Sequence, residues 1–183
     1  MVKRLPWAVL ALAVAVLACK FGSTPPPPVP VSDEAAQELQ QGVATAVQQA
    51  IDTGNLTLEV TESQITSAVV LALQQRSEIP INDLQIHLRD EQVQLSGTAS
   101  QQGLELPVQI VIKVGVQDCK PKVEIVSASA GPLPIPEDQL SGFIPMVETV
   151  ITNLMTSSTV SNLCLLSVSV GDGVMTVTGQ VPK

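Results

Sequence analysis

Few residues of this chain are able to do chemistry. Histidine occurs once, at His87, and cysteine occurs three times, at Cys19, Cys119 and Cys164. A zinc site needs three or four protein ligands at short spacing, and one histidine with three scattered cysteines does not provide them. His87 lies on the polar side of an expected strand, so we expect it to be solvated. Because no serine lies in a nucleophile-elbow pattern either, the sequence predicts a protein that is not an enzyme and holds no metal and no cofactor.

The adjacent carboxylates have structural explanations. Asp90 and Glu91 stand at a turn between two alternating stretches, and Glu137 and Asp138 stand at an expected helix start, where acidic residues are favoured. The stretch "GDG" at residues 171–173 is typical of a tight hairpin turn and not of a phosphate-binding loop. None of these groups predicts a catalytic pair.

Cys19 closes the stretch "VLAC" at the end of an apolar run. Lys3 and Arg4 precede this run, which covers residues 7–18 and ends in small residues, the layout of a secretory signal. It is shorter than the ~20 apolar residues of a membrane-spanning helix. The stretch resembles the bacterial lipobox, which implies that residues 1–18 are a signal peptide and that Cys19 is the lipidated first residue of the mature chain. The alternative is an ordinary secretory signal that is cut nearby.

In both cases we expect an exported protein. With the lipobox it is a lipoprotein, lipid-anchored to a bacterial membrane and facing the periplasm or the cell exterior. Residues 19–32 include "PPPPVP", which can form neither a helix nor a ladder and therefore predicts an extended tether. The remaining residues, 33–183, are long enough for a single domain with a core of its own.

Cys119 and Cys164 remain once Cys19 is assigned to the anchor. In an oxidising compartment, two cysteines in one small domain favour a disulfide. The bond would tie the far turn of a long strand pair to the start of the last hairpin. A free buried pair is the alternative.

Charge and composition limit the partners. The formal net charge is -8, hydrophobic residues make up 45% of the chain, and aromatic residues make up 2%. Phosphate binding depends on clustered Lys and Arg, so nucleic acid is excluded as a partner. Surfaces that bind proteins, bases or sugars usually use aromatic anchors, which are scarce here. The interior must be built from Val, Ile, Leu and Ala, and it is either a plain core or a cavity for acyl chains.

Hydrophobic periodicity predicts three helices. Residues 33–52 repeat apolar positions at helical spacing, and "TESQ" at residues 61–64 is a capping box that begins a second helix, ending near residue 76. A third helix follows Pro136, and Pro145 should kink or break it.

Alternation of period two predicts the strands. A short strand covers residues 56–60, a hairpin covers 84–99, and a long strand at 104–116 returns through 123–125. The last hairpin, 166–181, aligns with the first without gaps and matches Gly179 to Gly97. We therefore interpret the chain as a helix-and-hairpin unit used twice around the long strand pair.

The long strand constrains the fold class. At ~3.3 Å per residue it spans roughly 40 Å, which in a small domain implies a curved sheet. We expect an α+β fold in which a curved antiparallel sheet of long strands and hairpins wraps around two or three apolar helices.

Five segments follow one another in an order that resembles the LmeA-like phospholipid-binding proteins. They are "TESQITSAVVLAL", "LRDEQVQLSGTA", "LELPVQIVIKVGV", "GPLPIPEDQL" and "VGDGVMTVTG". The resemblance covers about residues 61–180, and its most specific part is the link at residues 131–136. It implies a half-tubular lipid-binding-like fold, with a curved sheet, an apolar groove and no catalytic residues.

The resemblance assigns a role to the aliphatic interior. We expect an extracytoplasmic, membrane-anchored lipoprotein that binds or transfers phospholipid or another long-chain amphiphile in a groove between its helices and its sheet. The candidate lining residues are Ile65, Val69, Leu73, Leu106, Val108, Ile110, Ile112, Val147, Ile151 and Leu154. Each is equally compatible with an ordinary core. The alternative is a non-catalytic envelope scaffold, or a surface-interaction module with a filled core, because the hairpins also resemble the membrane-associated BON module.

Overall fold

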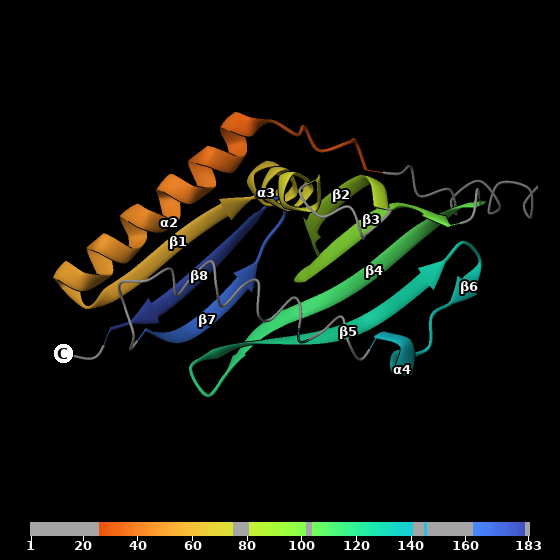
Figure 1. The fold of residues 1–183 in the computed structure, drawn as a ribbon. Helices are drawn as coiled ribbons and strands as arrows, with labels where there is room; N and C mark the ends of the chain where they lie inside the picture. The colour runs from red at the N-terminus through yellow and green to blue at the C-terminus, as the bar shows by residue number, and fades with distance from the viewer. Residues whose placement is uncertain (1–25, 75–80, 102–103, 141–144, 146–162, 182–183) are drawn as a thin grey trace, which may run out of the picture.

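The chain folds as an α+β structure with two antiparallel sheets (Figure 1). The computed structural model describes residues 26–74, 81–101, 104–140, 145 and 163–181. The elements of this part are α2 (Asp33–Thr53), β1 (Asn55–Thr61), α3 (Glu62–Gln74), β2 (Ile81–Arg89), β3 (Gln92–Gln101), β4 (Leu104–Gln117), β5 (Lys120–Ala130), β6 (Leu133–Pro134), α4 (Glu137–Leu140), β7 (Cys164–Val170) and β8 (Val174–Gln180).

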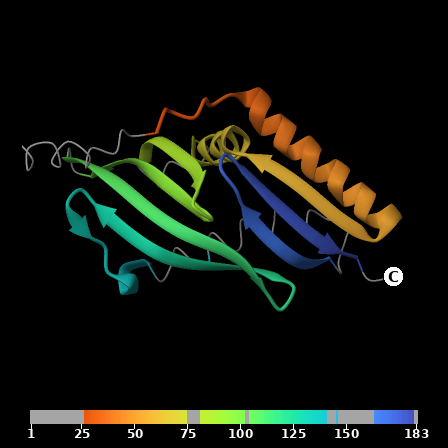
Figure 2. The same cartoon turned by 180° about the vertical axis from the view of Figure 1, so that it is seen from behind.

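The predicted α+β class is confirmed, but the strands divide differently from the expectation. Instead of one sheet, β2-β3-β4-β5-β6 form a five-stranded sheet and β1-β8-β7 form a three-stranded sheet. The two sheets lie side by side (Figure 2). The last hairpin therefore pairs with β1, and its strands do not extend the sheet of the first hairpin. Of the predicted third helix, α4 is described, and the stretch from residue 146 to 162 lies outside the described residues.

The ends of α2 are set by local hydrogen bonds. The Ser32 hydroxyl accepts a bond from the N–H of Ala35 at 3.1 Å, and the N–H of Ser32 donates to the hydroxyl of Ser67 on α3 at 3.0 Å. Gly54 ends the helix in the left-handed region, at φ +84°, and donates to the carbonyl of Ala50 at 2.8 Å. These caps confirm the helix that periodicity predicts at residues 33–52.

The start of α3 is the predicted capping box. The N–H of Gln64 donates to the Thr61 hydroxyl at 3.3 Å, and the Gln64 side chain accepts from the N–H of Thr61 at 3.0 Å. The exchange satisfies two backbone donors at the junction of β1 and α3.

Tight turns and a long strand shape the five-stranded sheet. β4 has 14 residues, which confirms the predicted long strand. The two-residue turns Asp90-Glu91 and Asp118-Cys119 have positive φ at both positions. This is the geometry of type I′ hairpins, whose twist matches that of the flanking strands.

The first and last hairpins both have a β-bulge next to their aligned glycines, Gly97 and Gly179. In each, the first strand carries a β-bulge at the position of Gly97 or Gly179. A Cβ on Gly97 would lie 3.0 Å from the side chain of Ile81, and one on Gly179 would lie 2.9 Å from the carbonyl oxygen of Cys164. The bulged strand comes so close that only glycine fits without displacement of its neighbours.

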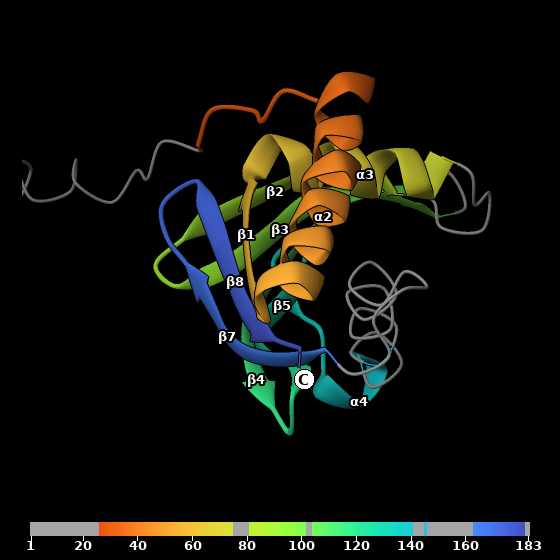
Figure 3. The same ribbon diagram turned by 90° about the vertical axis from the view of Figure 1, so that its left-hand side faces the viewer.

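Two clusters of buried aliphatic side chains lie between the helices and the sheets. The first joins α2 to the three-stranded sheet and includes Leu39, Ala46, Ala50, Leu56, Leu58, Val60, Leu165 and Val177. The second lies on the five-stranded sheet and includes Ile86, Leu88, Val93, Ile112, Val123 and Val170. Ile65 of α3 and Met175 of β8 pack against both clusters, so the interior is continuous. Figure 3 shows α2 and α3 on the same side of the strands.

The segment before α2 lies against the rest of the structure. Val29 is 7% exposed, and its N–H donates to the side chain of Gln85 on β2. The carbonyl of Pro30 accepts a bond from the Ser63 hydroxyl at 2.7 Å. Part of the stretch that the sequence assigns to the tether is therefore held against α3 and β2. From α2 the segment runs back toward the end of the five-stranded sheet where β4 begins (Figures 1 and 2).

Candidate functional site

One face of β4 changes gradually from core to surface. Ile112 is 3% exposed and belongs to the second cluster, whereas Leu106 is 37% and Leu104 is 60% exposed. Val108 and Ile110, which lie between them, are half-buried. Alternation along the strand puts all five side chains on one face. We call Leu104, Leu106, Val108 and Ile110 the aliphatic strip; it continues the core outward along the sheet.

Small side chains flank the aliphatic strip. Ala99 of β3, and Ala128 and Ala130 of β5, pair directly with members of the strip. Directly paired residues of antiparallel strands share a face of the sheet, so these alanines stand on both sides of the strip. A methyl group covers little of a neighbouring Leu, Val or Ile side chain. The residues that pair with Leu106 and Val108 are therefore small, whereas Leu95 pairs with Ile110 and Gln101 pairs with Leu104.

The strip ends among exposed leucines. Leu133 of β6 pairs with Ala130 and is 69% exposed. Because this pairing puts Leu133 on the face of the strip, one end of the sheet carries three exposed leucines. We call Leu104, Leu106 and Leu133 the leucine end.

The lining residues that the sequence predicts differ in their burial: some belong to the core and others lie nearer the surface. Ile65 and Val69 of α3 pack against the second cluster, as Ile110 does, and Ile112 is a member of that cluster. Leu73 is half-buried on the last turn of α3. Leu106 and Val108 lie on the more exposed part of the strip. The remaining candidates, Val147, Ile151 and Leu154, lie outside the described residues.

The most buried residues of α3 are polar, although the sequence suggests an aliphatic stripe. Thr66 and Ser67 are both 0% exposed, while Ala68 and Val69 are half-buried. The Thr66 hydroxyl lies 3.3 Å from both the N–H and the carbonyl of Ile86, where it donates to the carbonyl and accepts from the N–H. Since β2 is an edge strand, Thr66 satisfies backbone groups of that edge that no neighbouring strand can reach.

Glu62 forms a second contact with the same edge, which the sequence analysis missed. Its carboxylate accepts a bond from the N–H of Leu88 at 2.7 Å and pairs with the guanidinium of Arg89. The backbone of Gly173, in the turn between β7 and β8, accepts from the N–H of Glu62 at 3.2 Å and donates to the carbonyl of Leu88 at 3.0 Å. Glu62 and Gly173 thus connect both sheets and α3. In the sequence, Glu62 is recognisable only as an acidic residue in the first turn of a capped helix. Such a position does not indicate a hydrogen-bond partner far along the chain.

The expectation that His87 is solvated is wrong. His87 is 5% exposed, and its Nδ1 lies 3.9 Å from a Glu62 carboxylate oxygen. The first turn of α3 lies against β2 at this point and excludes water from a side chain that alternation alone places on the polar face. Nδ1 has no hydrogen-bond partner among the described residues.

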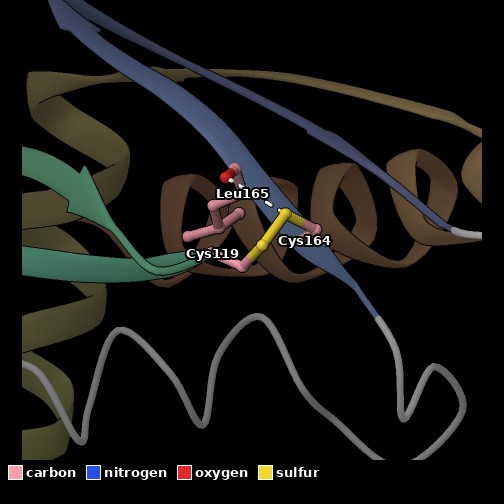
Figure 4. Close-up of a disulfide and its surroundings, with 3 residues drawn as sticks. All are labelled: Cys119, Cys164 and Leu165. Atoms are coloured by element: carbon pink, nitrogen blue, oxygen red, sulfur yellow. Dashed lines mark hydrogen bonds between the residues drawn. A yellow bond between two sulfur atoms is a disulfide. The ribbon is translucent and has the colours of Figure 1, made fainter.

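A disulfide joins the other end of the two sheets (Figure 4). Cys119, in the turn between β4 and β5, is bonded to Cys164, the first residue of β7, across 45 positions of sequence and a Cα–Cα distance of 4.4 Å. The N–H of Leu165 donates to the carbonyl of Cys119 at 3.2 Å. The predicted disulfide is therefore present, and it makes a second connection between the sheets.

Clusters suited to metal binding are not found in the part of the chain that the structure describes: no three His, Cys, Asp or Glu side chains gather there in a suitable arrangement. Among the same residues, no helix is long and apolar enough to cross a bilayer.

Comparison with known proteins does not assign the chain to a group. No protein-family model matches the sequence, and no curated protein matches it.

Proposed function

We propose that the protein binds a long-chain amphiphile, of which phospholipid is the leading example, with the alkyl chain along the aliphatic strip. The observation that carries this proposal is the fall in exposure along one face of β4, from 60% at Leu104 to 3% at Ile112. A side-chain row that is apolar throughout and passes from surface to core matches a ligand with a polar head and an apolar tail.

The setting of the strip supports an aliphatic ligand. Alanine and glycine pair with Leu106 and Val108 of the strip, and the chain as a whole has 2% aromatic residues. Stacking surfaces for bases or sugars are built from aromatic rings, whereas alkyl chains need only continuous apolar area, worth about 25 cal/mol per Å² removed from water.

The N-terminal sequence supports a place next to a membrane. We infer that Cys19 is lipidated after removal of residues 1–18 and that the domain is held on the outer side of a bacterial membrane, facing the periplasm or the exterior. The half-tubular arrangement that the LmeA-like resemblance implies belongs to the same proposal, because a curved strand layer with α2 and α3 on one side would shelter an alkyl chain.

Native mass spectrometry of the full-length protein purified from cells tests the proposal. We expect a population whose mass exceeds that of the lipidated chain by one phospholipid-sized molecule, and uptake of a fluorescent phospholipid by protein stripped of this molecule. Val108→Gln places an amide in the middle of the strip and should reduce both the bound population and the uptake.

Val174→Gln is the matched control. Val174 is 37% exposed and lies on β8, opposite Thr61, away from the strip. It should leave both readouts unchanged. Repeated absence of bound lipid and of uptake in the wild type would refute the amphiphile proposal and favour the filled-core scaffold.

A further inference from the structure

We propose that the leucine end is the surface with which the protein contacts the bilayer, and that the occupant of this surface is the acyl-chain region of phospholipids. The inference rests on the proposed lipid anchor at Cys19, and it adds an orientation: Leu104, Leu106 and Leu133 face the membrane, and the disulfide end points away from it.

The docked N-terminal segment limits how far the domain can move from its anchor. Hydrogen bonds hold this segment to the domain from Val29 onward, and Pro26 is the first described residue. Pro26 follows Cys19 by 7 positions. Even fully extended, that stretch reaches at most about 25 Å.

The course of the N-terminal segment also determines which end of the domain lies near the anchor. It crosses β2 at Gln85 and continues toward the end of the sheet where β2 and β4 begin (Figures 1 and 2). β4 is about 43 Å long at the usual rise per residue. The stretch from Cys19 to Pro26 is therefore shorter than β4. It keeps the beginning of β4 close to the bilayer, whereas Cys119, which lies beyond the end of β4, is distant from the bilayer.

The chemistry of this end is that of an apolar contact. Its three leucines are 60%, 37% and 69% exposed and lie on one face of the sheet. The described lysines of the sheet, Lys113, Lys120 and Lys122, lie toward the opposite end. Attachment at the leucine end therefore does not depend on anionic lipid, and it brings the open end of the aliphatic strip to the source of its ligand.

Tryptophan quenching in vesicles tests the orientation. Full-length protein carrying Leu104→Trp, Leu133→Trp or Leu166→Trp is reconstituted into phosphatidylcholine vesicles with or without bromine on the acyl chains. Leu166 is the matched control, since it is 51% exposed but lies two residues after Cys164, at the disulfide end. The lipidated wild type, which has lost the single tryptophan Trp7 with residues 1–18, contains no tryptophan and supplies the background.

We expect brominated lipid to reduce the emission of L104W and L133W and to leave that of L166W unchanged. The use of two reporters at the leucine end allows for a substitution that disturbs folding, which circular dichroism of each variant detects. Equal emission of all three variants in the two kinds of vesicle, or equal quenching of all three, would overturn the proposed orientation.

The same preparation separates this inference from the amphiphile proposal. Native mass spectra of the wild type without bound lipid, together with selective quenching of L104W and L133W, would refute ligand binding while supporting the membrane contact. Bound lipid without selective quenching would refute the membrane contact alone.

Discussion

The carboxylate of Glu62 accepts a hydrogen bond from the backbone N–H of Leu88 at a distance of 2.7 Å. The contact runs from the first turn of α3 to the edge of β2, 26 positions further along the chain. Leu88 is 0% exposed, so loss of the acceptor would leave its N–H in a buried environment. Together with the bonds between Thr66 and Ile86, this bond joins the helix to the edge of the sheet.

We predict that Glu62→Ala lowers the free energy of unfolding by about 1–3 kcal/mol, because it leaves a buried N–H without an acceptor. Glu62→Gln should cost less, since its amide oxygen can still accept from Leu88. Urea unfolding followed by circular dichroism measures both. Glu59→Ala, at an exposed position of β1, is the control. A Glu62→Ala midpoint equal to that of the control would contradict the role of the carboxylate.

Gly179, where an added Cβ would be crowded, can be compared with Gly115, where it would not be. Gly179→Ala would place its Cβ 2.9 Å from a backbone oxygen of β7, and we expect a loss of about 1–3 kcal/mol in unfolding free energy from overpacking. A Cβ at Gly115 meets nothing within 4 Å, so Gly115→Ala should be neutral or slightly stabilising. Thermal unfolding of the two variants provides the test, and equal midpoints would argue against the close approach at Gly179.

Reduction of the disulfide should loosen the connection between the sheets. The double substitution Cys119→Ser/Cys164→Ser, or treatment of the wild type with dithiothreitol, is expected to lower stability by about 2–4 kcal/mol. Cys119 is exposed, so the reductant can reach it. Thermal unfolding with and without reductant is the measurement. The double variant should not respond to reductant, and a wild type that is equally insensitive would show that the bond contributes little.

Ser32 caps α2 through its hydroxyl and contacts Ser67 of α3 through its backbone N–H, so its replacement by alanine should remove the cap alone. Ser32→Ala removes the oxygen that caps the N–H of Ala35, at an expected cost of about 1 kcal/mol. Thr45→Ala, at an exposed position within α2, is the matched control and should be neutral. The difference is measured by urea unfolding. If both variants unfold at the same urea concentration, the cap is not contributing to stability.

Much of the local structure follows from the sequence alone. The capping box at Thr61 and Gln64, the helix that Gly54 ends, the turn at Asp90 and the length of β4 were all predicted and are confirmed. Each depends on residues a few positions apart, or on an alternation that any extended strand must show. Such preferences act before tertiary contacts form, so they can be read directly from the residue order.

The candidate site was predicted only in part, for a physical reason. Alternation correctly puts Leu106, Val108, Ile110 and Ile112 on one face of β4, but it does not state what packs on that face. Leu106 is 37% exposed and Ile112 is 3% exposed, although the alternation assigns both to the same apolar face. Their difference arises from α3 and β7, which cover one end of the strand and not the other.

The sequence by itself indicated the class of the longer elements, the turns, the cysteine pair and the one-sided character of the long strand, but it did not predict that Leu133 and Pro134 pair with β5. Tertiary structure decided that the strands form two sheets, that His87 is buried beneath the first turn of α3, and that Val29 is docked on β2. These outcomes depend on contacts between residues that lie 25 or more positions apart, such as Glu62 with Leu88 and Val29 with Gln85. Residue patterns specify which side chains share a face, whereas the competition among faces for burial is settled only when the whole chain is packed.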